Sequence, residues 1–149
     1  MSNVIANEKI VSVSVKQTQA LASQLAKKIL VSQPRVGALV LALEGDLGSG
    51  KTTFTQGLAK GLGVKGRITS PTFVVMKRFK NFYHFDCYRL QKPEEILELG
   101  WQEIIANPQN IVAIEWPERI KKFLPKHFFQ LNFTFLDQKK RRIVINNKP

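Results

Sequence analysis

Residues 45–52 read Gly45-Asp46-Leu47-Gly48-Ser49-Gly50-Lys51-Thr52. They match the pattern G-x-x-x-x-G-K-[ST] of a phosphate-binding P-loop at every fixed position. Glycines let the backbone adopt positive φ angles and let phosphate oxygens approach its amide groups closely. Lys51 can bridge the β- and γ-phosphates of a nucleotide, and the Thr52 hydroxyl can coordinate Mg²⁺. The pattern predicts a nucleotide site, and the alternative is a glycine turn without chemistry.

The segments on both sides of this loop suit a P-loop. Gly37 to Leu43 lack polar alternation, which is typical of a central strand buried on both faces. Lys51 to Leu62 predict a helix that ends at Gly61 and Gly63. A buried strand therefore leads into the loop, and the N-terminus of a helix faces the phosphates beyond it.

The rest of the chain mixes predicted strands with predicted helices. Ile10 to Val15 alternate with period two, as in a half-buried strand, and Thr18 suits the N-cap of an amphipathic helix to about Val31. Pro93 suits the start of another helix, with acidic residues in its first turn. Further strands are predicted at residues 72–79, 82–85, 110–114, 128–135 and 142–145.

This order of elements predicts an α/β fold. We expect a single P-loop NTPase-like domain over residues 1–149, because the length leaves no room for a second ordinary domain. Its central mixed β-sheet is flanked by helices, and residues 128–145 form a C-terminal β-hairpin that turns at residues 136–139.

The composition is that of a globular chain with a strong basic excess. The 149 residues are 44% hydrophobic, and 23 Lys and Arg against 11 Asp and Glu give a net charge of +12. The excess lies at the two ends: residues 1–75 carry 9 basic and 3 acidic side chains and residues 119–149 carry 9 and 1, whereas residues 76–118 carry 5 and 7. The imbalance indicates an anionic partner such as a nucleotide, a nucleic acid or an acidic protein surface.

Cysteine content and hydropathy bear on the compartment. The single cysteine, Cys87, excludes an internal disulfide and a zinc site built from several cysteines. Residues 1–8 lack the features of a secretory signal, and no apolar run approaches the length of about 18 residues that a membrane span needs. We therefore expect a cytoplasmic location, no membrane contact, and an inert Cys87 thiol because no base is paired with it.

Two acidic residues at predicted strand ends are candidate partners of the loop. Glu115 directly follows the apolar run 111–114, where a P-loop protein places the acid that organises Mg²⁺ or acts on the attacking water. Asp86 follows residues 82–85, where it could hold Mg²⁺ through water or position the attacking water. Arg89 could supply positive charge to the γ-phosphate or to a partner, and a solvated Asp–Arg pair is the alternative.

Three further features have two interpretations each. On residue type alone, we interpret Trp116 as a core aromatic rather than a lid near the nucleotide. In the same way we interpret His84 as a packed histidine rather than a ligand. Ser70 and Thr72 lie in the run 69–72, between the predicted loop helix and the next strand, where phosphate-sensing switch loops lie. A plain proline turn is the alternative for that run.

Four segments together resemble one family, the bacterial TsaE (YjeE-type) P-loop ATPases of tRNA threonylcarbamoyladenosine biosynthesis. The segments are Gly45–Thr53, Ser70–Phe73, His84–Leu90 and Ile114–Glu118. The sequences HFD-x-YR and EWP make the resemblance specific, whereas the P-loop alone is common to many families. The segments before residue 37 and after residue 119 match the family in outline only.

The resemblance implies an activity and its partners. Members of this family bind ATP and Mg²⁺ and hydrolyse ATP in a way that depends on the TsaB and TsaD proteins, which transfer threonylcarbamoyl to adenosine in tRNA. A weak ATPase that its partners stimulate is therefore expected, with tRNA reached through the complex.

The resemblance also implies roles for particular residues. It makes Thr52 and Glu115 the metal ligands and gives phosphate binding to Gly48 through Thr53. Lys51 and Asp86 join Glu115 as catalytic residues. Switch or partner roles fall to Ser70, Thr72, Arg89 and Trp116, with Trp116 near the site. We place the adenine contacts at Val15 to Thr18.

Two other functions fit parts of the sequence. A small-molecule or nucleoside kinase also uses a P-loop, but its lid carries several arginines, whereas Arg67, Arg78 and Arg89 are scattered here. A basic RNA-binding nucleotide sensor would use Lys121, Lys122 and the run 139–142 on RNA phosphates. The alternative for that run is a solvated charge cluster that protects an edge strand from pairing, and we favour it.

Overall fold

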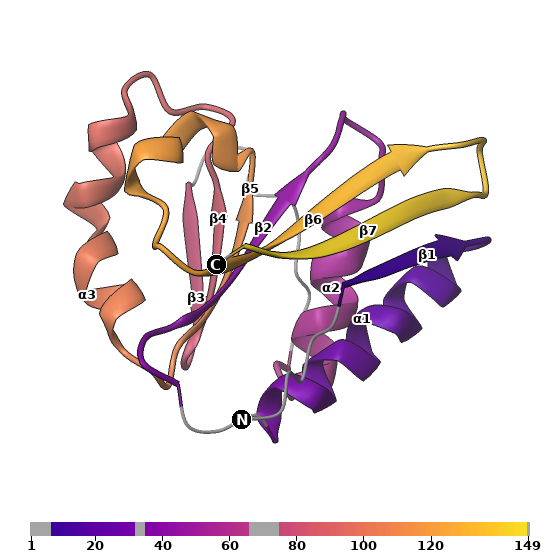
Figure 1. Cartoon of the computed structure of the whole chain (residues 1–149), viewed down its shortest axis with the longest axis horizontal. Coiled ribbons are helices and arrows are strands. Elements are labelled where there is room, and N and C mark those ends of the chain that lie inside the picture. The colour runs from indigo at the N-terminus through magenta and orange to yellow at the C-terminus, as the bar shows by residue number, and fades with distance from the viewer. Residues whose placement is uncertain (1–6, 32–34, 66–74, 149) are drawn as a thin grey trace.

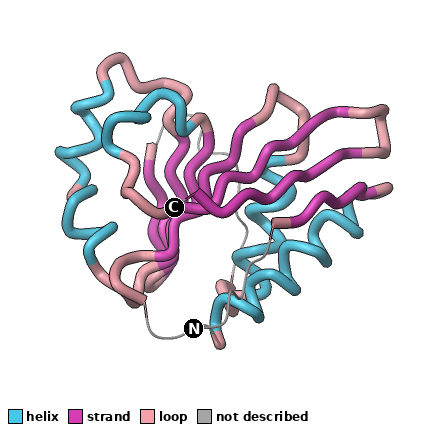
Figure 2. The backbone as a smooth tube through the Cα atoms, viewed as in Figure 1, coloured by secondary structure: helices cyan, strands magenta, loops and turns pink. Residues whose placement is uncertain are grey.

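A computed structural model describes residues 7–31, 35–65 and 75–148. Its strands form one sheet in the order β1-β7-β6-β2-β5-β4-β3, with helices on both faces (Figures 1 and 2). Here η denotes a 3-10 helix. The elements are β1 (Glu8–Ser12), α1 (Val15–Leu30), β2 (Leu39–Glu44), α2 (Lys51–Gly61), β3 (Met76–Phe79), β4 (Phe82–Asp86), η1 (Pro93–Leu99), α3 (Trp101–Ala106), β5 (Ile111–Glu115), η2 (Pro117–Phe123), β6 (Phe128–Phe135) and β7 (Arg141–Lys148).

The centre of the sheet is parallel and its margins are antiparallel. Strands β6, β2, β5 and β4 run in one direction. The pairs β3–β4, β6–β7 and β1–β7 are antiparallel, so β1 runs in the same direction as the central strands. The predicted α/β fold with a mixed sheet is confirmed. The carboxyl ends of β1, β2, β4, β5 and β6 consequently meet at one edge of the sheet.

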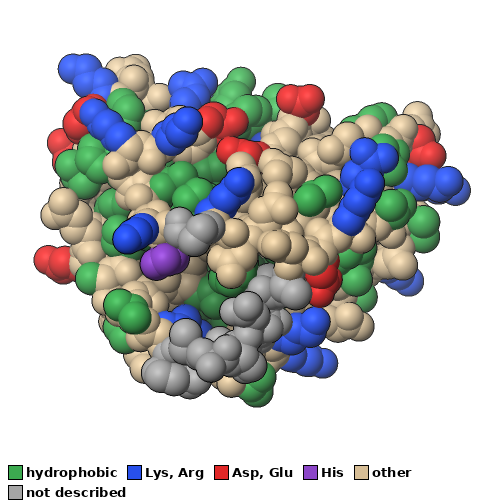
Figure 3. All heavy atoms as spheres, in the orientation of Figure 1, with side chains coloured by type: hydrophobic (Ala, Val, Ile, Leu, Met, Phe, Trp, Pro, Cys, Tyr) green, Lys and Arg blue, Asp and Glu red, His purple; other side chains and the backbone are tan. Residues whose placement is uncertain are grey.

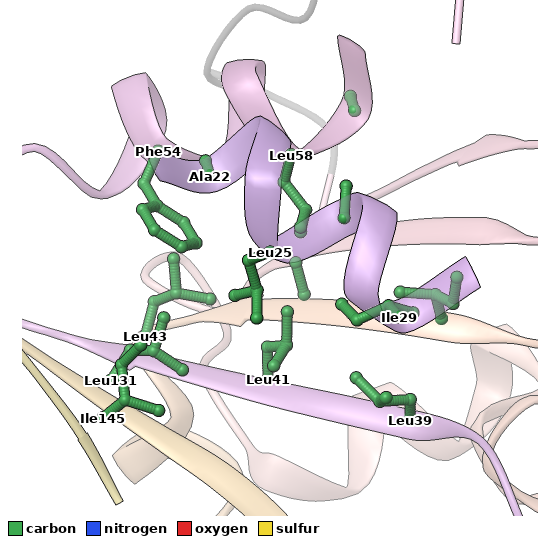
Figure 4. Close-up of a cluster of buried hydrophobic side chains, with 14 of the residues drawn as sticks. Ala22, Leu25, Ile29, Leu39, Leu41, Leu43, Phe54, Leu58, Leu131 and Ile145 are labelled. Carbon is green, nitrogen blue, oxygen red and sulfur yellow. The ribbon is translucent and has the colours of Figure 1, made fainter. Parts of the chain in front are cut away.

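One core lies between the sheet and the pair α1 and α2. Figure 4 shows apolar side chains of both helices directed toward alternate residues of β2, which is buried as its unbroken apolar sequence predicts. The labelled members of this core are Ala22, Leu25, Ile29, Leu39, Leu41, Leu43, Phe54, Leu58, Leu131 and Ile145. Each fully buried large side chain contributes about 1.5–3 kcal/mol through the hydrophobic effect.

A second core lies on the opposite face, under η1, α3 and η2. The intervening residues of β4 and β5, such as Phe85 and Ile114, point to this side and pack against Trp101. The rings of Phe85 and Trp101 meet edge to face, with centroids 5.2 Å apart. Because β4 and β5 are covered on both faces, their sequences are almost wholly apolar until each ends in an acidic residue.

Helices α1 and α2 pack unusually closely through two glycines. A Cβ atom at Gly57 would lie 2.6 Å from the Gln19 Cα, and one at Gly61 would lie 2.7 Å from the Ser23 carbonyl oxygen. No side chain fits at these distances, so glycine at both positions lets the α2 backbone lie directly against α1. This contact holds the helix that follows the P-loop.

The beginning of α1 differs from the sequence prediction. Thr18 is not the N-cap: α1 begins at Val15, and the Ser14 hydroxyl caps it by accepting a hydrogen bond from the Gln17 amide at 3.0 Å. Strand β1 accordingly ends at Ser12 rather than at Val15. Thr18 instead lies buried in the first turn, where its hydroxyl is 2.6 Å from that of Ser12. Ser14 is the cap because its hydroxyl, at the junction of strand and helix, accepts from the Gln17 amide, whereas the Thr18 hydroxyl donates to the Ser14 carbonyl oxygen.

The C-terminal hairpin is confirmed, but β7 is not an edge strand, contrary to the expectation. Strand β7 pairs with β6 on one side and with β1 on the other, so the edge-strand explanation of the basic run 139–142 is wrong. Lys139 and Lys140 lie in the turn, whereas Arg141 and Arg142 pair with β1. In the described part of the chain, no helix is long and apolar enough to cross a membrane.

Candidate functional site

The P-loop leaves the carboxyl end of β2 and enters α2, as predicted. Gly50, with a φ of 105°, stands at the N-cap of α2 in a left-handed conformation that other residues rarely adopt. At Gly45 a Cβ atom would lie 2.7 Å from the Phe133 carbonyl oxygen of β6, so the loop presses against the neighbouring strand. These glycines set the path of the loop and the direction of α2.

A pocket of about 820 Å³ lies at this edge of the sheet, where the strand ends meet. Such a volume suits a nucleotide-sized ligand. The lining residues from the loop and the neighbouring strands are Leu47, Gly48, Gly50, Lys51, Thr52, Thr53, Val75, Asp86, Tyr88, Arg89, Glu115 and Trp116. The sequence-predicted residues of three separate segments thus line one cavity.

Lys51 is held in place by two neighbours. Its Nζ donates a hydrogen bond to the Gly45 carbonyl oxygen and lies 3.8 Å from the centre of the Trp116 ring, a cation–π contact. Burial lowers the pKa of the Lys51 ammonium, and the nearby carboxylates of Glu115, Glu118 and Asp86 oppose that shift. The side chain is therefore poised beside the loop and surrounded by acidic groups.

Trp116 lies at the pocket rather than wholly in the core. The residue has a φ of 59°, a left-handed conformation in which the chain turns sharply from β5 into η2. Its ring packs against the Tyr88 ring, with centroids 5.0 Å apart. It lines the pocket next to Lys51, whose Nζ it contacts. Part of the side chain also packs on the second core, so the core aromatic and the pocket-lining interpretations of Trp116 each hold in part.

Glu115 is the buried acid at the centre of the site. Its side chain is only 4% exposed, and its two oxygens contact different partners. Oε1 accepts a hydrogen bond from the Thr52 hydroxyl at 3.4 Å, and Oε2 lies 2.6 Å from His84 Nε2. The carboxylate thus joins the first turn of α2 to the end of β5.

Asp86 lies beside Glu115, because the two residues are paired in register on β4 and β5. Its Oδ1 accepts a hydrogen bond from the Tyr88 amide at 3.1 Å. Burial raises the pKa of the Asp86 carboxyl, and the charge of Glu115 adds to this shift, while the Tyr88 amide opposes it. A more basic carboxylate at the pocket wall is suited to accept a proton or to orient water.

Other predicted residues fall into three groups. Arg89 lines the pocket, and its role beside a phosphate or a partner stays a prediction. Cys87 is fully buried, and burial raises the pKa of its thiol to about 12, which agrees with the inert role predicted for it. Ser70 and Thr72 lie outside the described residues.

The far end of the pocket is built from segments that are distant in sequence. The junction of β1 and α1 supplies Val13, Ser14, Val15 and Thr18, which overlap the segment expected to meet adenine. The turn between β6 and β7 supplies Gln138, Lys139 and Arg141. Figure 3 shows Lys and Arg side chains at the end of the molecule where β6 and β7 join.

The hairpin contribution to the pocket and the contact of His84 with Glu115 were missed from sequence. The basic run 139–142 suggested an anion but not which one, since only the pairing of β6 with β2 brings the turn to the loop. His84 lies two residues before Asp86 on the same strand face, and this period-two spacing was the available signal.

The oxygen donors at the site suit a magnesium ion. Mg²⁺ is a hard cation that proteins hold through one or two carboxylates together with substrate phosphates. The Thr52 hydroxyl and Glu115 Oε1 lie 3.4 Å apart in the pocket, with the Asp86 carboxylate on the same wall. These residues would hold the ion beside a phosphate bound to the loop.

Comparison with models of protein families agrees with the resemblance found in the sequence. The model of the family described as "Threonylcarbamoyl adenosine biosynthesis protein TsaE" matches residues 12–143. The chain belongs to the TsaE family. The resemblance of the four sequence segments is thereby confirmed.

Individual relatives agree with the TsaE assignment. A Rickettsia conorii tRNA threonylcarbamoyladenosine biosynthesis protein TsaE is 39% identical over 142 residues, which cover 91% of this chain and 77% of that protein. A TsaE of the same name from Nostoc is 40% identical over 125 residues, with 78% and 75% covered. The crystal structure of Bacillus subtilis YdiB superposes with a TM-score of 0.74 at 31% identity and covers 99% of this chain and 90% of that one.

Proposed function

We propose that this protein is an Mg²⁺-dependent ATPase that serves threonylcarbamoyl modification of adenosine in tRNA together with TsaB and TsaD. The names of its TsaE relatives support the pathway. The observation that carries the activity is the convergence of Lys51, Thr52 and Glu115 on one pocket at the carboxyl edge of a P-loop sheet.

Different residues bind the phosphates, bind the metal ion and orient the attacking water. The amides from Gly48 to Thr53 and the N-terminus of α2 bind the phosphates, and Lys51 moves from Trp116 to the β- and γ-phosphates. Thr52 and Glu115 would hold Mg²⁺, which would supply neutralisation of the charge on the phosphate oxygens. Asp86, whose pKa is raised by burial, orients the attacking water.

The distribution of basic residues favours a nucleotide over an RNA strand as the ligand of this pocket. Lys139 and Arg141 line the same cavity as Lys51, rather than a separate groove. The rings that line it, Tyr88 and Trp116, are packed against each other, and Trp116 contacts Lys51 of the loop. Contact with tRNA then comes through the TsaB–TsaD complex.

Phosphate release measured with malachite green, with and without the TsaB–TsaD pair, tests this proposal. We expect slow release from the protein alone, faster release with the pair, and none from Lys51→Ala in either case. A release rate that the pair leaves unchanged would count against the accessory role. Transfer of labelled γ-phosphate to a small molecule instead of water would identify a kinase.

A further inference from the structure

His84 is the buried polar side chain closest to the catalytic carboxylate. It lies on β4 between Phe82 and Asp86 on the face that meets α2, and its side chain has no exposed surface. Phe82 on this face and Ala113, which pairs with His84 on β5, both belong to an apolar core. A histidine here costs desolvation that an apolar residue would avoid, so a plain packing role does not explain it.

The hydrogen bond of His84 identifies its donor atom. Nε2 lies 2.6 Å from Glu115 Oε2, and an ionised carboxylate oxygen only accepts, so this contact requires the tautomer in which Nε2 carries the proton and donates it. Nδ1 has no hydrogen-bond partner among the residues that the structure describes. The ring is therefore committed to a single polar contact, and that contact is Glu115.

This contact leaves the two oxygens of the Glu115 carboxylate with different partners. With Oε2 held by His84, Oε1 faces the Thr52 hydroxyl on α2, on the side of the P-loop. Without His84, a carboxylate that is only 4% exposed would keep one oxygen unpaired in the protein interior and would rotate toward another donor. Lys51 is the nearby cation, and a direct contact with it would take the lysine from the phosphates.

We propose that His84 is a positioning residue that orients Glu115 for magnesium. The proposal rests on the proposed function. His84 fixes the carboxylate so that Oε1 and the Thr52 hydroxyl present two oxygens to the ion beside the bound phosphates. His84 itself touches neither the nucleotide nor the metal. Hydrogen-bond partners of metal ligands act in this way in many sites, and their loss costs about 10- to 100-fold in metal affinity or activity.

Two substitutions at position 84 separate positioning from packing. His84→Phe keeps an aromatic ring and removes the donor, whereas His84→Gln keeps an amide donor near the position of Nε2. The readout is Mn²⁺ affinity of the ADP-bound protein, measured by electron paramagnetic resonance, because this needs no turnover. We expect His84→Phe to weaken Mn²⁺ about 10- to 100-fold, His84→Gln to restore most of the loss, and metal-free ADP affinity to stay unchanged.

A double-mutant cycle with Glu115→Gln tests whether the two residues act together. If His84 works through Glu115, His84→Phe causes no further loss of Mn²⁺ affinity in the Glu115→Gln background. Additive losses, or a His84→Phe protein with wild-type Mn²⁺ affinity and turnover, would overturn the proposal. His84→Asn, whose shorter amide stops short of Glu115, replaces His84→Phe if the latter does not fold.

The outcomes distinguish this inference from the proposed function. A wild type that binds Mn²⁺ with ADP but releases no phosphate would overturn the ATPase proposal alone. The Mn²⁺ affinities of His84→Phe and His84→Gln would still decide the role of His84. A wild type that binds no Mn²⁺ with ADP would overturn both. A loss of melting temperature in His84→Phe with unchanged Mn²⁺ affinity would identify a packing residue.

Discussion

At the scale of single residues, the site is a set of side chains that constrain one another. Lys51 lies on the face of Trp116, and Glu115 lies between Thr52 and His84. Sequence motifs named four of these five residues as parts of the site, but not the contacts between them. Those contacts depend on strand register, which places residues of separate segments side by side.

Replacement of Asp86 by asparagine should stabilise the free protein at neutral pH. The pKa of Asp86 is raised in the folded state above the ordinary 3.8, so folding favours the protonated form and the ionised carboxylate costs stability. The gain in unfolding free energy of Asp86→Asn is present in full above the raised pKa and vanishes as pH falls below about 3.8. Urea unfolding across a pH series measures it. A loss of stability at neutral pH would contradict the expectation.

Trp116 should report the occupancy of the P-loop. Because Lys51 Nζ lies 3.8 Å from its ring centre, departure of the lysine toward phosphate changes the environment of the indole. We expect ATP to alter the tryptophan fluorescence of the wild type and of Trp101→Phe, but not of Trp116→Phe. Trp101, buried in the second core, serves as the matched control. A signal that survives Trp116→Phe would show that Trp101 reports the binding instead, and it would contradict the expectation.

At the scale of elements, local chemistry predicted most of the helices and strands, and tertiary pairing decided the rest. The P-loop helix, the buried strand β2 and the acid-terminated strands β4 and β5 follow their sequence patterns. Ser14 displaced Thr18 as the N-cap because a hydroxyl at the junction can bond the Gln17 amide. The pairing of β7 with β1 joins the two ends of the chain, and no local pattern indicates it.

The close contact of α1 with α2 makes Gly57 sensitive to any side chain. In an exposed helix, glycine to alanine is stabilising by about 1 kcal/mol. At Gly57 the added Cβ would lie 2.6 Å from the Gln19 Cα, so Gly57→Ala should instead destabilise by about 1–3 kcal/mol. Chemical denaturation measures the change, with Lys60→Ala on the exposed side of α2 as control. Equal stabilities for Gly57→Ala and the wild type would mean that α1 and α2 separate easily.

At the scale of the whole molecule, the fold gathers distant segments around one pocket. The parallel direction of β1, β2, β4, β5 and β6 brings their carboxyl ends to one edge. The net charge of +12 pointed to an anion, and part of that charge, at Lys139 and Arg141, lies at this pocket. The loop and its acids could be predicted from sequence because they are local motifs. The hairpin wall could not, since it depends on the order of the strands.

The proposed function depends on binding of ATP with Mg²⁺ through Lys51 and Glu115. Calorimetric titration with a non-hydrolysable ATP analogue, with and without Mg²⁺, measures this binding. We predict binding to the wild type that Mg²⁺ strengthens, loss of binding in Lys51→Ala, and binding without the Mg²⁺ gain in Glu115→Gln. Unchanged binding in Lys51→Ala, or an equal Mg²⁺ gain in Glu115→Gln, would contradict the claim.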